Sequence, residues 1–199
     1  MAREGYPYIL VLAVPALVAL AASWFVAGAI LAGLALFVGY FFRDPERRFD
    51  GGANHVASPA DGRVVSVRQE NGSEVLSIFL SVFDVHVNRA PVTGKISKIE
   101  YKRGKFLAAF EDRASSENEQ NIITMDQGGR SVRFAQIAGV VARRIVCWRH
   151  EGDSLTVGDR IGLIKFGSRV DVFLPAGSRI LVKTGERVRA GETVIGELP

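Results

Sequence analysis

Cysteine and histidine are scarce in this chain, which has one cysteine and three histidines among its 199 residues. The single cysteine, Cys147, excludes an internal disulfide and any zinc site built from several cysteines. It lies in the apolar run at 145–148, so we interpret it as a core residue, and we expect no metal cofactor. The chain also lacks a long run of Lys and Arg with interleaved aromatics, which argues against nucleic acid as the partner. Its net charge of +4 suits anionic membrane surfaces or phosphate-bearing substrates instead.

Charged side chains are absent from residues 8–42. As one helix rising about 1.5 Å per residue, this run would be about 50 Å long, whereas the hydrocarbon core of a bilayer is about 30 Å thick. Two short helices fit better, with a break near Ala22-Ser23-Trp24 and Trp24 at the depth of the interface. A signal peptide is the alternative, because Ala19-Leu20-Ala21 resembles a cleavage site. The second apolar half would remain after such a cut, so we predict a hydrophobic membrane anchor at 1–42.

Basic residues flank this anchor on both sides, with Arg3 before it and Arg43, Arg47 and Arg48 after it. The positive-inside rule then places both ends, and the domain that follows, on the cytoplasmic side of the cell membrane. A polar, turn-rich connector at 43–54 leads to the domain that we expect at 55–199.

The pattern beyond the connector is mostly that of strands. Alternating or continuous apolar runs predict strands at 62–68, 75–80 and 94–101, and a hairpin over 121–137 that turns at 127–130. We expect one helix at 139–145. Spaced glycines near the C-terminus resemble the strands of biotinyl and lipoyl barrels, although no lysine occupies a carrier-like hairpin tip. The fold class is therefore predicted as α+β and β-dominated, partly barrel-like with lipoyl-like hairpins, after an N-terminal hydrophobic helical hairpin.

The bond between Gly167 and Ser168 lies in a strand-like apolar run close to the C-terminus. A serine behind a glycine can attack the carbonyl of its own peptide bond. The resulting ester can eliminate to a dehydroalanine, which hydrolyses to a pyruvoyl group, a ketone that no standard side chain offers. The same dipeptide recurs at Gly72-Ser73 and Gly177-Ser178, so the dipeptide alone carries no weight. Such chemistry needs a base to activate the hydroxyl and a group to orient that base.

His86 is the favoured candidate for that base, because His55 and His150 lie in polar segments typical of exposed loops. The apolar stretch around His86 carries three further polar residues: Asp84, Asn88 and Arg89. In an extended chain Asp84, His86 and Asn88 share one face. Buried polar groups are costly unless paired, so their clustering indicates a site. A structural hydrogen-bond cluster is the alternative. Asp61, taken alone, is a turn residue before a strand.

Five motifs occur in the order seen in the short-form phosphatidylserine decarboxylases, and together they span nearly all of the chain. The motifs are Phe41-Phe42-Arg43-Asp44-Pro45-Glu46-Arg47; Ser58-Pro59-Ala60-Asp61-Gly62; Phe83-Asp84-Val85-His86-Val87-Asn88-Arg89; Gln136-Ile137-Ala138-Gly139 with Ala142-Arg143-Arg144-Ile145-Val146; and Phe166-Gly167-Ser168-Arg169-Val170-Asp171. The chain therefore resembles that family, whose archaeal relatives are expected to act on archaetidylserine instead of phosphatidylserine.

The resemblance implies self-cleavage at Gly167-Ser168 into a β chain, 1–167, and an α chain, 168–199, that begins with a pyruvoyl group derived from Ser168. It also implies that Asp61 and His86 form a protease-like triad with Ser168, and that the substrate is a membrane phospholipid. The chain departs from the long bacterial members at Arg89, where they carry a second histidine. His86 then serves both self-cleavage and decarboxylation, or another group substitutes. Candidate substrate contacts are Asp84, Asn88, Arg89, Lys165 and Arg169.

Three other readings of the sequence remain. The first is a pyruvoyl enzyme that acts on a soluble amino acid, which the anchor at 8–42 argues against. A non-enzymatic, membrane-anchored β module explains the C-terminal glycines but not the polar cluster around His86. A serine hydrolase lacks its usual sequence signal here, because the chain has no Gly-x-Ser-x-Gly motif. A homo-oligomer is compatible with each of these readings.

Overall fold

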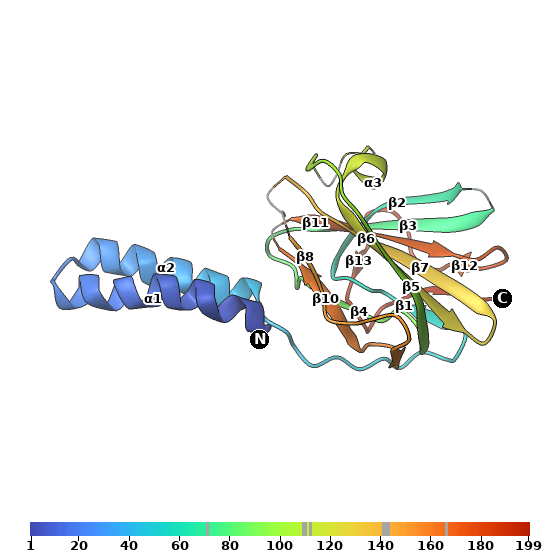
Figure 1. The fold of residues 1–199 in the computed structure, drawn as a ribbon, viewed down its shortest axis with the longest axis horizontal. Coiled ribbons are helices and arrows are strands. Elements are labelled where there is room, and N and C mark those ends of the chain that lie inside the picture. The colour runs from blue at the N-terminus through green and yellow to red at the C-terminus, as the bar shows by residue number, and fades with distance from the viewer. Residues whose placement is uncertain (71, 109–110, 112, 141–143, 166) are drawn as a thin grey trace. The chain divides into compact units, whose positions relative to one another are not determined.

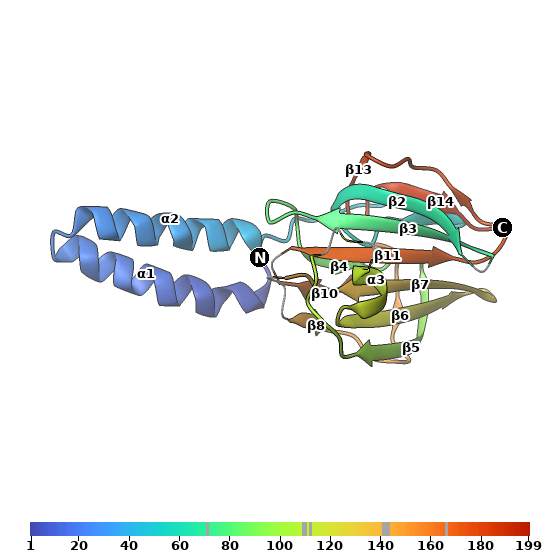
Figure 2. The ribbon, with the colours of Figure 1, turned by 90° about the horizontal axis from the view of Figure 1, so that it is seen from above.

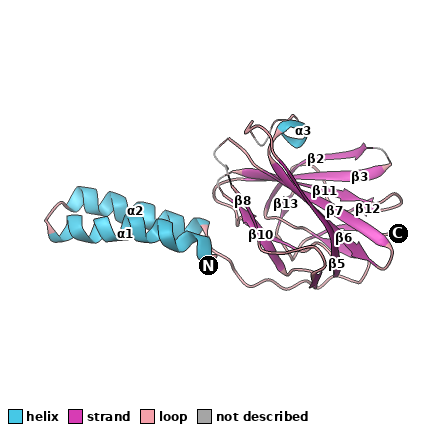
Figure 3. Cartoon of the chain, viewed as in Figure 1, coloured by secondary structure: helices cyan, strands magenta, loops and turns pink. Residues whose placement is uncertain are grey.

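A computed structural model describes residues 1–199 except 71, 109–110, 112, 141–143 and 166. The described residues form two compact units, Met1–Glu46 and Arg47–Pro199. Helices dominate the first unit and strands the second, whose described part holds one short helix, α3 (Ala114–Glu117) (Figure 3).

The N-terminal unit is a hairpin of two apolar helices, α1 (Tyr6–Ala21) and α2 (Phe25–Phe41), preceded by a short 3-10 helix at Arg3–Gly5. The helices are separated at the predicted break, where Ser23 has a φ of +64°. They pack through small residues: a Cβ on Gly28 would lie 2.6 Å from Leu20 side-chain carbons. Residues Arg3–Ala21 are long and apolar enough to cross a membrane, whereas α2 is shorter.

The second unit is built on an eight-stranded antiparallel sheet with the strand order β13-β2-β3-β11-β7-β6-β5-β9 (Figures 1 and 2). Its strands are β2 (Gly62–Glu70), β3 (Ser73–Leu80), β5 (Gly94–Lys102), β6 (Gln120–Gln127), β7 (Arg130–Ile137), β9 (Ser154–Leu155), β11 (Ser168–Leu174) and β13 (Arg187–Val188). Two three-stranded sheets complete the unit: β1 (His55–Ala57), β14 (Val194–Glu197) and β12 (Arg179–Ile180), and β4 (Val87–Arg89), β10 (Arg160–Ile164) and β8 (Ile145–Cys147).

These elements confirm the predicted β-dominated α+β class with an apolar helical N-terminus. The three predicted single strands and the hairpin of β6 and β7 are all present. The helix predicted at 139–145 is wrong where it can be compared, because Ile145 begins strand β8 and residues 139, 140 and 144 are not helical. The remainder of that prediction, 141–143, lies outside the described residues.

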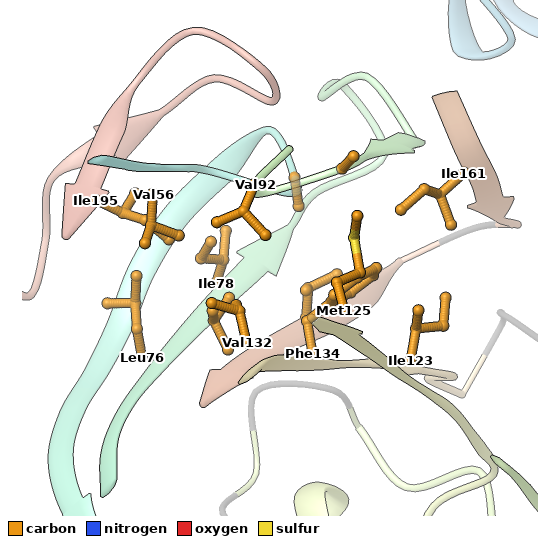
Figure 4. Packing of buried hydrophobic residues seen from close by; sticks show 14 of the residues in the cluster. Val56, Leu76, Ile78, Val92, Ile123, Met125, Val132, Phe134, Ile161 and Ile195 are labelled. Carbon is orange, nitrogen blue, oxygen red and sulfur yellow. The ribbon is translucent and has the colours of Figure 1, made fainter. Parts of the chain in front are cut away.

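The core lies on one face of the large sheet and is filled mainly by aliphatic side chains (Figure 4). Strand β11 shows how the faces divide: Val170, Val172 and Leu174 point into this core, whereas Phe173 packs with a smaller cluster on the opposite face. Cys147 is half-buried and packs against the core. Because side chains alternate along a strand, Ser168 belongs to the core-facing set and Arg169 to the opposite one.

Candidate active site

Ser168 is the first residue of β11, the strand that lies between β3 and β7 in the large sheet. It pairs with Leu80 and is 0% exposed. Its Oγ has no hydrogen-bond partner among the described residues. A buried hydroxyl left without a partner costs about 1–3 kcal/mol, so such a group in a folded protein calls for a functional or structural reason.

Burial distinguishes Ser168 from the other two serines that follow a glycine. The preceding glycines all have left-handed backbones, with φ of +78° at Gly72, +70° at Gly167 and +84° at Gly177. Positive φ therefore does not discriminate among the three pairs. Ser73 and Ser178, however, are both partly exposed as residues, although Oγ of Ser178 is also buried without a hydrogen-bond partner among the described residues. Ser73 and Ser168 each start a strand that is paired on both sides, but only Ser168 of the three serines is 0% exposed. All three pairs are described by the structure, and Ser168 is the most deeply buried of the three serines.

His86 lies directly before β4 and is buried. Its Nδ1 is 3.0 Å from the carbonyl oxygen of Asp84. A carbonyl only accepts hydrogen bonds, so Nδ1 carries the proton of the neutral ring and Nε2 carries the basic lone pair. The backbone of His86 also contacts the strand that leads to Ser168, because its carbonyl accepts from the N–H of Ile164 at 3.4 Å.

Asp61 lies at the start of β2, at the same end of the sheet as Ser168. The register shows this, because Arg63 on β2 and Arg169 on β11 both pair with Phe79 on β3. With strands spaced about 4.8 Å apart, the backbones of β2 and β11 are about 10 Å from one another. The structure thus brings Asp61 and Ser168 to the same end of the large sheet, and the triad of these residues with His86 stays a prediction.

The carboxylate of Asp61 is held by Arg47 and by a backbone amide. Nη2 of Arg47 donates to Oδ2 at 2.9 Å and to Oδ1 at 3.3 Å, and the N–H of Ala190 donates to Oδ1 at 2.8 Å. Nη1 of the same guanidinium donates to Glu192 at 2.9 Å. These charge-assisted bonds fix the orientation of the carboxylate. The sequence pattern placed Arg47 only on the flank of the membrane anchor, and the place of Arg47 in the first motif was the available signal for this contact.

Arg89 lies beside the turn that carries Asp61. Its N–H donates to the carbonyl of Pro59 at 2.9 Å, and its Nη1 donates to the carbonyl of Gly158 at 2.9 Å. A Cβ on Gly191 would lie 2.9 Å from Cδ of Arg89 and 3.7 Å from Cβ of Arg47. Two arginines therefore flank Gly191 next to the Asp61 turn.

Three buried amide side chains form a chain of hydrogen bonds behind the site. Asn121 donates to Gln136 Oε1 at 2.9 Å, and Gln136 donates to Asn88 Oδ1 at 2.9 Å. Asn88 in turn donates to the carbonyl of Pro59 at 3.3 Å. The chain connects β6, β7 and β4 with the turn that carries Asp61. The sequence pattern predicted no role for Gln136, although a polar residue at the end of an otherwise apolar strand was an available signal.

The remaining predicted substrate contacts occupy different places. Arg169 is buried on the opposite face from Ser168, where its Nε donates to Asp171 at 2.7 Å and its Nη2 to Ser77 at 2.7 Å. Lys165 is buried and lies between the end of β10 and Ser168 in the chain. Arg169 therefore faces away from Ser168, whereas Lys165 lies three positions before Ser168 in the chain.

Asp84 accepts hydrogen bonds from the N–H and Oγ of Ser81 in a turn. The extended backbone expected for residues 84–88 therefore begins only at Val87.

Comparisons with known proteins show which family the chain belongs to. The sequence profile of the family described as phosphatidylserine decarboxylase matches residues 34–196 of the chain. A phosphatidylserine decarboxylase proenzyme of Symbiobacterium thermophilum is 51% identical over 207 residues, covering 100% of this chain and 96% of that protein. One of Solibacter usitatus is 54% identical over 162 residues, covering 81% of this chain and 79% of that protein. The chain belongs to the phosphatidylserine decarboxylase family.

Family membership confirms the resemblance that the five motifs indicated. The matched range contains Asp61, His86 and Ser168, together with Arg47 and Gln136. The described residues contain no group of three or more His, Cys, Asp or Glu side chains placed to hold a metal ion.

Proposed function

We propose that this chain is a proenzyme that cleaves its own Gly167–Ser168 bond and then decarboxylates phosphatidylserine to phosphatidylethanolamine with release of CO₂. The observation that carries the proposal is the buried Oγ of Ser168, at the head of the central strand of a phosphatidylserine decarboxylase fold. The two named relatives are both bacterial phosphatidylserine decarboxylase proenzymes, which supports phosphatidylserine over archaetidylserine as the substrate.

Self-cleavage requires the hydroxyl of Ser168 to attack the carbonyl carbon of Gly167. The peptide C–N bond breaks and an ester forms between Gly167 and the serine oxygen. Loss of the Cα proton expels the Gly167 carboxylate and leaves a dehydroalanine at position 168. Water then releases ammonia and leaves the pyruvoyl group. His86 is suited to accept the hydroxyl proton through Nε2, because Nδ1 is protonated toward Asp84. Asp61 supplies a fixed negative charge at the same end of the domain.

The cut leaves the two chains interleaved. Strand β11 of the α chain lies between β3 and β7, β13 pairs with β2, and β14 pairs with β1. All four partner strands belong to the β chain. The core contacts of β11 are likewise shared between the chains, because Val170, Val172 and Leu174 join a cluster that includes residues from both sides of the cleavage bond. The mature protein should therefore remain one folded unit without a covalent link between its chains.

A pyruvoyl group at position 168 supplies an electrophilic carbonyl that can act as an electron sink for the departing carboxylate's electrons. Side chains of the protein would deliver the proton, bind the charged groups of the substrate and position the turn that carries Asp61. His86 would deliver a proton through Nε2 to the substrate carbon that loses CO₂, the general-acid role that histidine side chains often fill in enzymes. Arg89 and Lys165 supply positive charge for the phosphodiester and the carboxylate. Asn88 holds the Pro59 carbonyl and so positions the Asp61 turn.

The apolar hairpin is proposed to anchor the enzyme through residues 8–42, with the catalytic unit in the cytoplasm. The length and apolar character of Arg3–Ala21 support membrane association. The arginines on both flanks, Arg3 before the hairpin and Arg43 and Arg48 after it, support the cytoplasmic orientation. Anchoring keeps the acyl chains of the substrate in the bilayer while the headgroup reacts.

Intact-mass analysis of the purified protein tests this function. We expect two species that together account for the full chain, with the α chain lighter by one ammonia than a fragment that begins with serine. Ser168→Ala should give one uncut, inactive polypeptide. Ser178→Ala is the matched control, because it removes the hydroxyl from the other Gly–Ser pair near the C-terminus and should mature normally. An uncut Ser168→Ala protein that still decarboxylates phosphatidylserine contradicts the proposal.

A further inference from the structure

We propose that the turn at residues 81–84 docks on an anionic lipid surface, with Val82 and Phe83 inserted at interface depth and arginines beside them at the headgroups. The proposal rests on the proposed function, because it assigns to this turn the task of holding the active site against the bilayer that contains the substrate. It concerns the catalytic unit alone and is independent of the apolar hairpin.

The turn is well defined by its own hydrogen bonds. The N–H of Asp84 donates to the carbonyl of Ser81 at 3.0 Å, which closes a four-residue β-turn. The carboxylate of Asp84 accepts from the N–H of Ser81 at 2.8 Å and from its Oγ at 2.7 Å. These three bonds fix the backbone, so the direction of the two central side chains is set before any partner binds. Pre-ordering of this kind lowers the entropy cost of docking.

The two central residues of the turn are apolar and exposed. Val82 is 36% exposed and Phe83 is 64% exposed. Central turn positions usually hold Gly, Pro, Asn, Asp or Ser, which satisfy turn geometry and water together. A valine and a phenylalanine at these positions neither favour the turn geometry nor form hydrogen bonds with water. Aromatic and aliphatic side chains on a rigid tip are the kind that insert into the boundary between headgroups and acyl chains.

Exposed arginines lie next to the turn, so the surface around it carries positive charge. Nη1 of Arg187 is 3.3 Å from Oδ1 of Asp84, and the side chain of Arg187 is 70% exposed. Arg187 pairs across β13 and β2 with Arg63, which is also exposed. Arg189 follows with a side chain 72% exposed. Residues 183–189 hold three cations and one acid, so this edge is net positive. Anionic headgroups are the complementary partner.

The turn is continuous with the active site. It follows Leu80, which pairs with Ser168, and it precedes His86 by two residues. The partner of Arg63 across the sheet is Phe79, so the arginines also lie at the end of β2 that carries Asp61. A lipid surface at this end would present headgroups to Ser168 and His86, whereas a surface at the opposite end of β11 would not.

Quenching of tryptophan fluorescence by brominated lipids tests the proposal with the full-length protein. Phe83→Trp in a background of Trp24→Phe and Trp148→Phe places a single reporter at the turn. The bilayers contain brominated phosphatidylcholine and phosphatidylglycerol, whose headgroup is anionic but has no serine to decarboxylate. We expect quenching of this reporter, but none for Leu181→Trp, a reporter in the same background at an exposed leucine beyond the far end of β11.

A charge variant tests the arginines separately. Arg189→Gln should raise the phosphatidylglycerol content needed for half-maximal quenching about fivefold, the effect expected for one arginine near an anionic surface. Arg179→Gln is the matched control, because Arg179 is equally exposed and also pairs with one acid, Glu197, at 2.8 Å. Equal effects of the two variants would contradict a specific role of Arg189.

The outcome separates this proposal from the proposed function. If Phe83→Trp is not quenched while the wild-type protein decarboxylates phosphatidylserine, the docking proposal is overturned and the enzyme assignment stands. If quenching occurs as expected, docking is supported whether or not the protein decarboxylates, because phosphatidylglycerol is not a substrate. As a further check, Val82→Ser with Phe83→Ser should mature normally yet lose more activity on phosphatidylserine in vesicles than on dispersed short-chain phosphatidylserine.

Discussion

The guanidinium of Arg47 is bound to the carboxylate of Asp61, with Nη2 and Oδ2 2.9 Å apart and both side chains largely buried. Arg47 is the first residue of the catalytic unit, and Asp61 is the acid of the predicted triad. The point where the chain enters the unit is thus tied directly to the active site. A change in Arg47 should affect both the stability of the unit and its maturation.

Arg47→Gln tests that relationship. Removing one partner leaves a poorly solvated carboxylate, which should lower the free energy of unfolding by about 3 kcal/mol. Because Asp61 would lose its orientation, self-cleavage should also slow. Thermal or urea unfolding and the fraction of cut chain on a denaturing gel measure the two effects. Arg48→Gln is the control: its side chain is 89% exposed in a pair with Asp50, so its effect should stay within about 0.5 kcal/mol. Similar losses for both variants would contradict the assignment.

His86→Ala should stop decarboxylation even in any fraction that has matured. The expected loss is about 100-fold or more, because a positioned acid–base group contributes about that much. The measurement is CO₂ release per mole of α chain that carries the pyruvoyl group, so that slow maturation is separated from slow catalysis. His150→Ala, in an exposed turn, should retain normal turnover. Normal turnover in matured His86→Ala protein would assign the proton transfer to another residue.

Gln136→Met should destabilise the fold by removing the middle link of the buried amide chain. It leaves Asn121 Nδ2 and Asn88 Oδ1 without their bonds to this side chain, and each such loss costs about 1–3 kcal/mol. We expect a lower unfolding midpoint in urea and slower self-cleavage, because Asn88 supports the Asp61 turn. Gln69→Met removes an exposed amide bonded to Glu74 and should be nearly neutral. Unchanged stability of Gln136→Met would show that the amide chain is dispensable.

The cut chains should co-elute on size exclusion under native conditions and separate only in denaturant. The reason is that β11, β13 and β14 of the α chain each pair with strands of the β chain. The measurement is native mass analysis beside a denaturing gel of the same sample. Dissociation of the α chain without denaturant would contradict the strand order reported above.

Local sequence pattern predicted much of the fold. The break in the apolar run, the single strands and the β6–β7 hairpin were all predicted, because alternation and turn residues act over a few positions. The pattern placed residue 145 in a helix, whereas Ile145 begins strand β8 and pairs with Ile164 on β10. That partner lies about twenty residues further along the chain, so no local signal reports it.

The features of the candidate site likewise divide into those set by neighbouring residues and those set by the tertiary structure. By itself, the sequence determined that the molecule has an uncharged N-terminal run, a cluster around His86 and three Gly–Ser bonds, because these are properties of neighbouring residues. Only the tertiary structure decided which of those serines is buried at the head of the central strand, and that Arg169 faces away from it. The pairing of Arg47 with Asp61 and of Gln136 with Asn88 joins residues 14 and 48 positions apart. Contacts over such separations form when strands assemble, since the packing of the whole sheet, and not local conformational preference, sets which side chains meet.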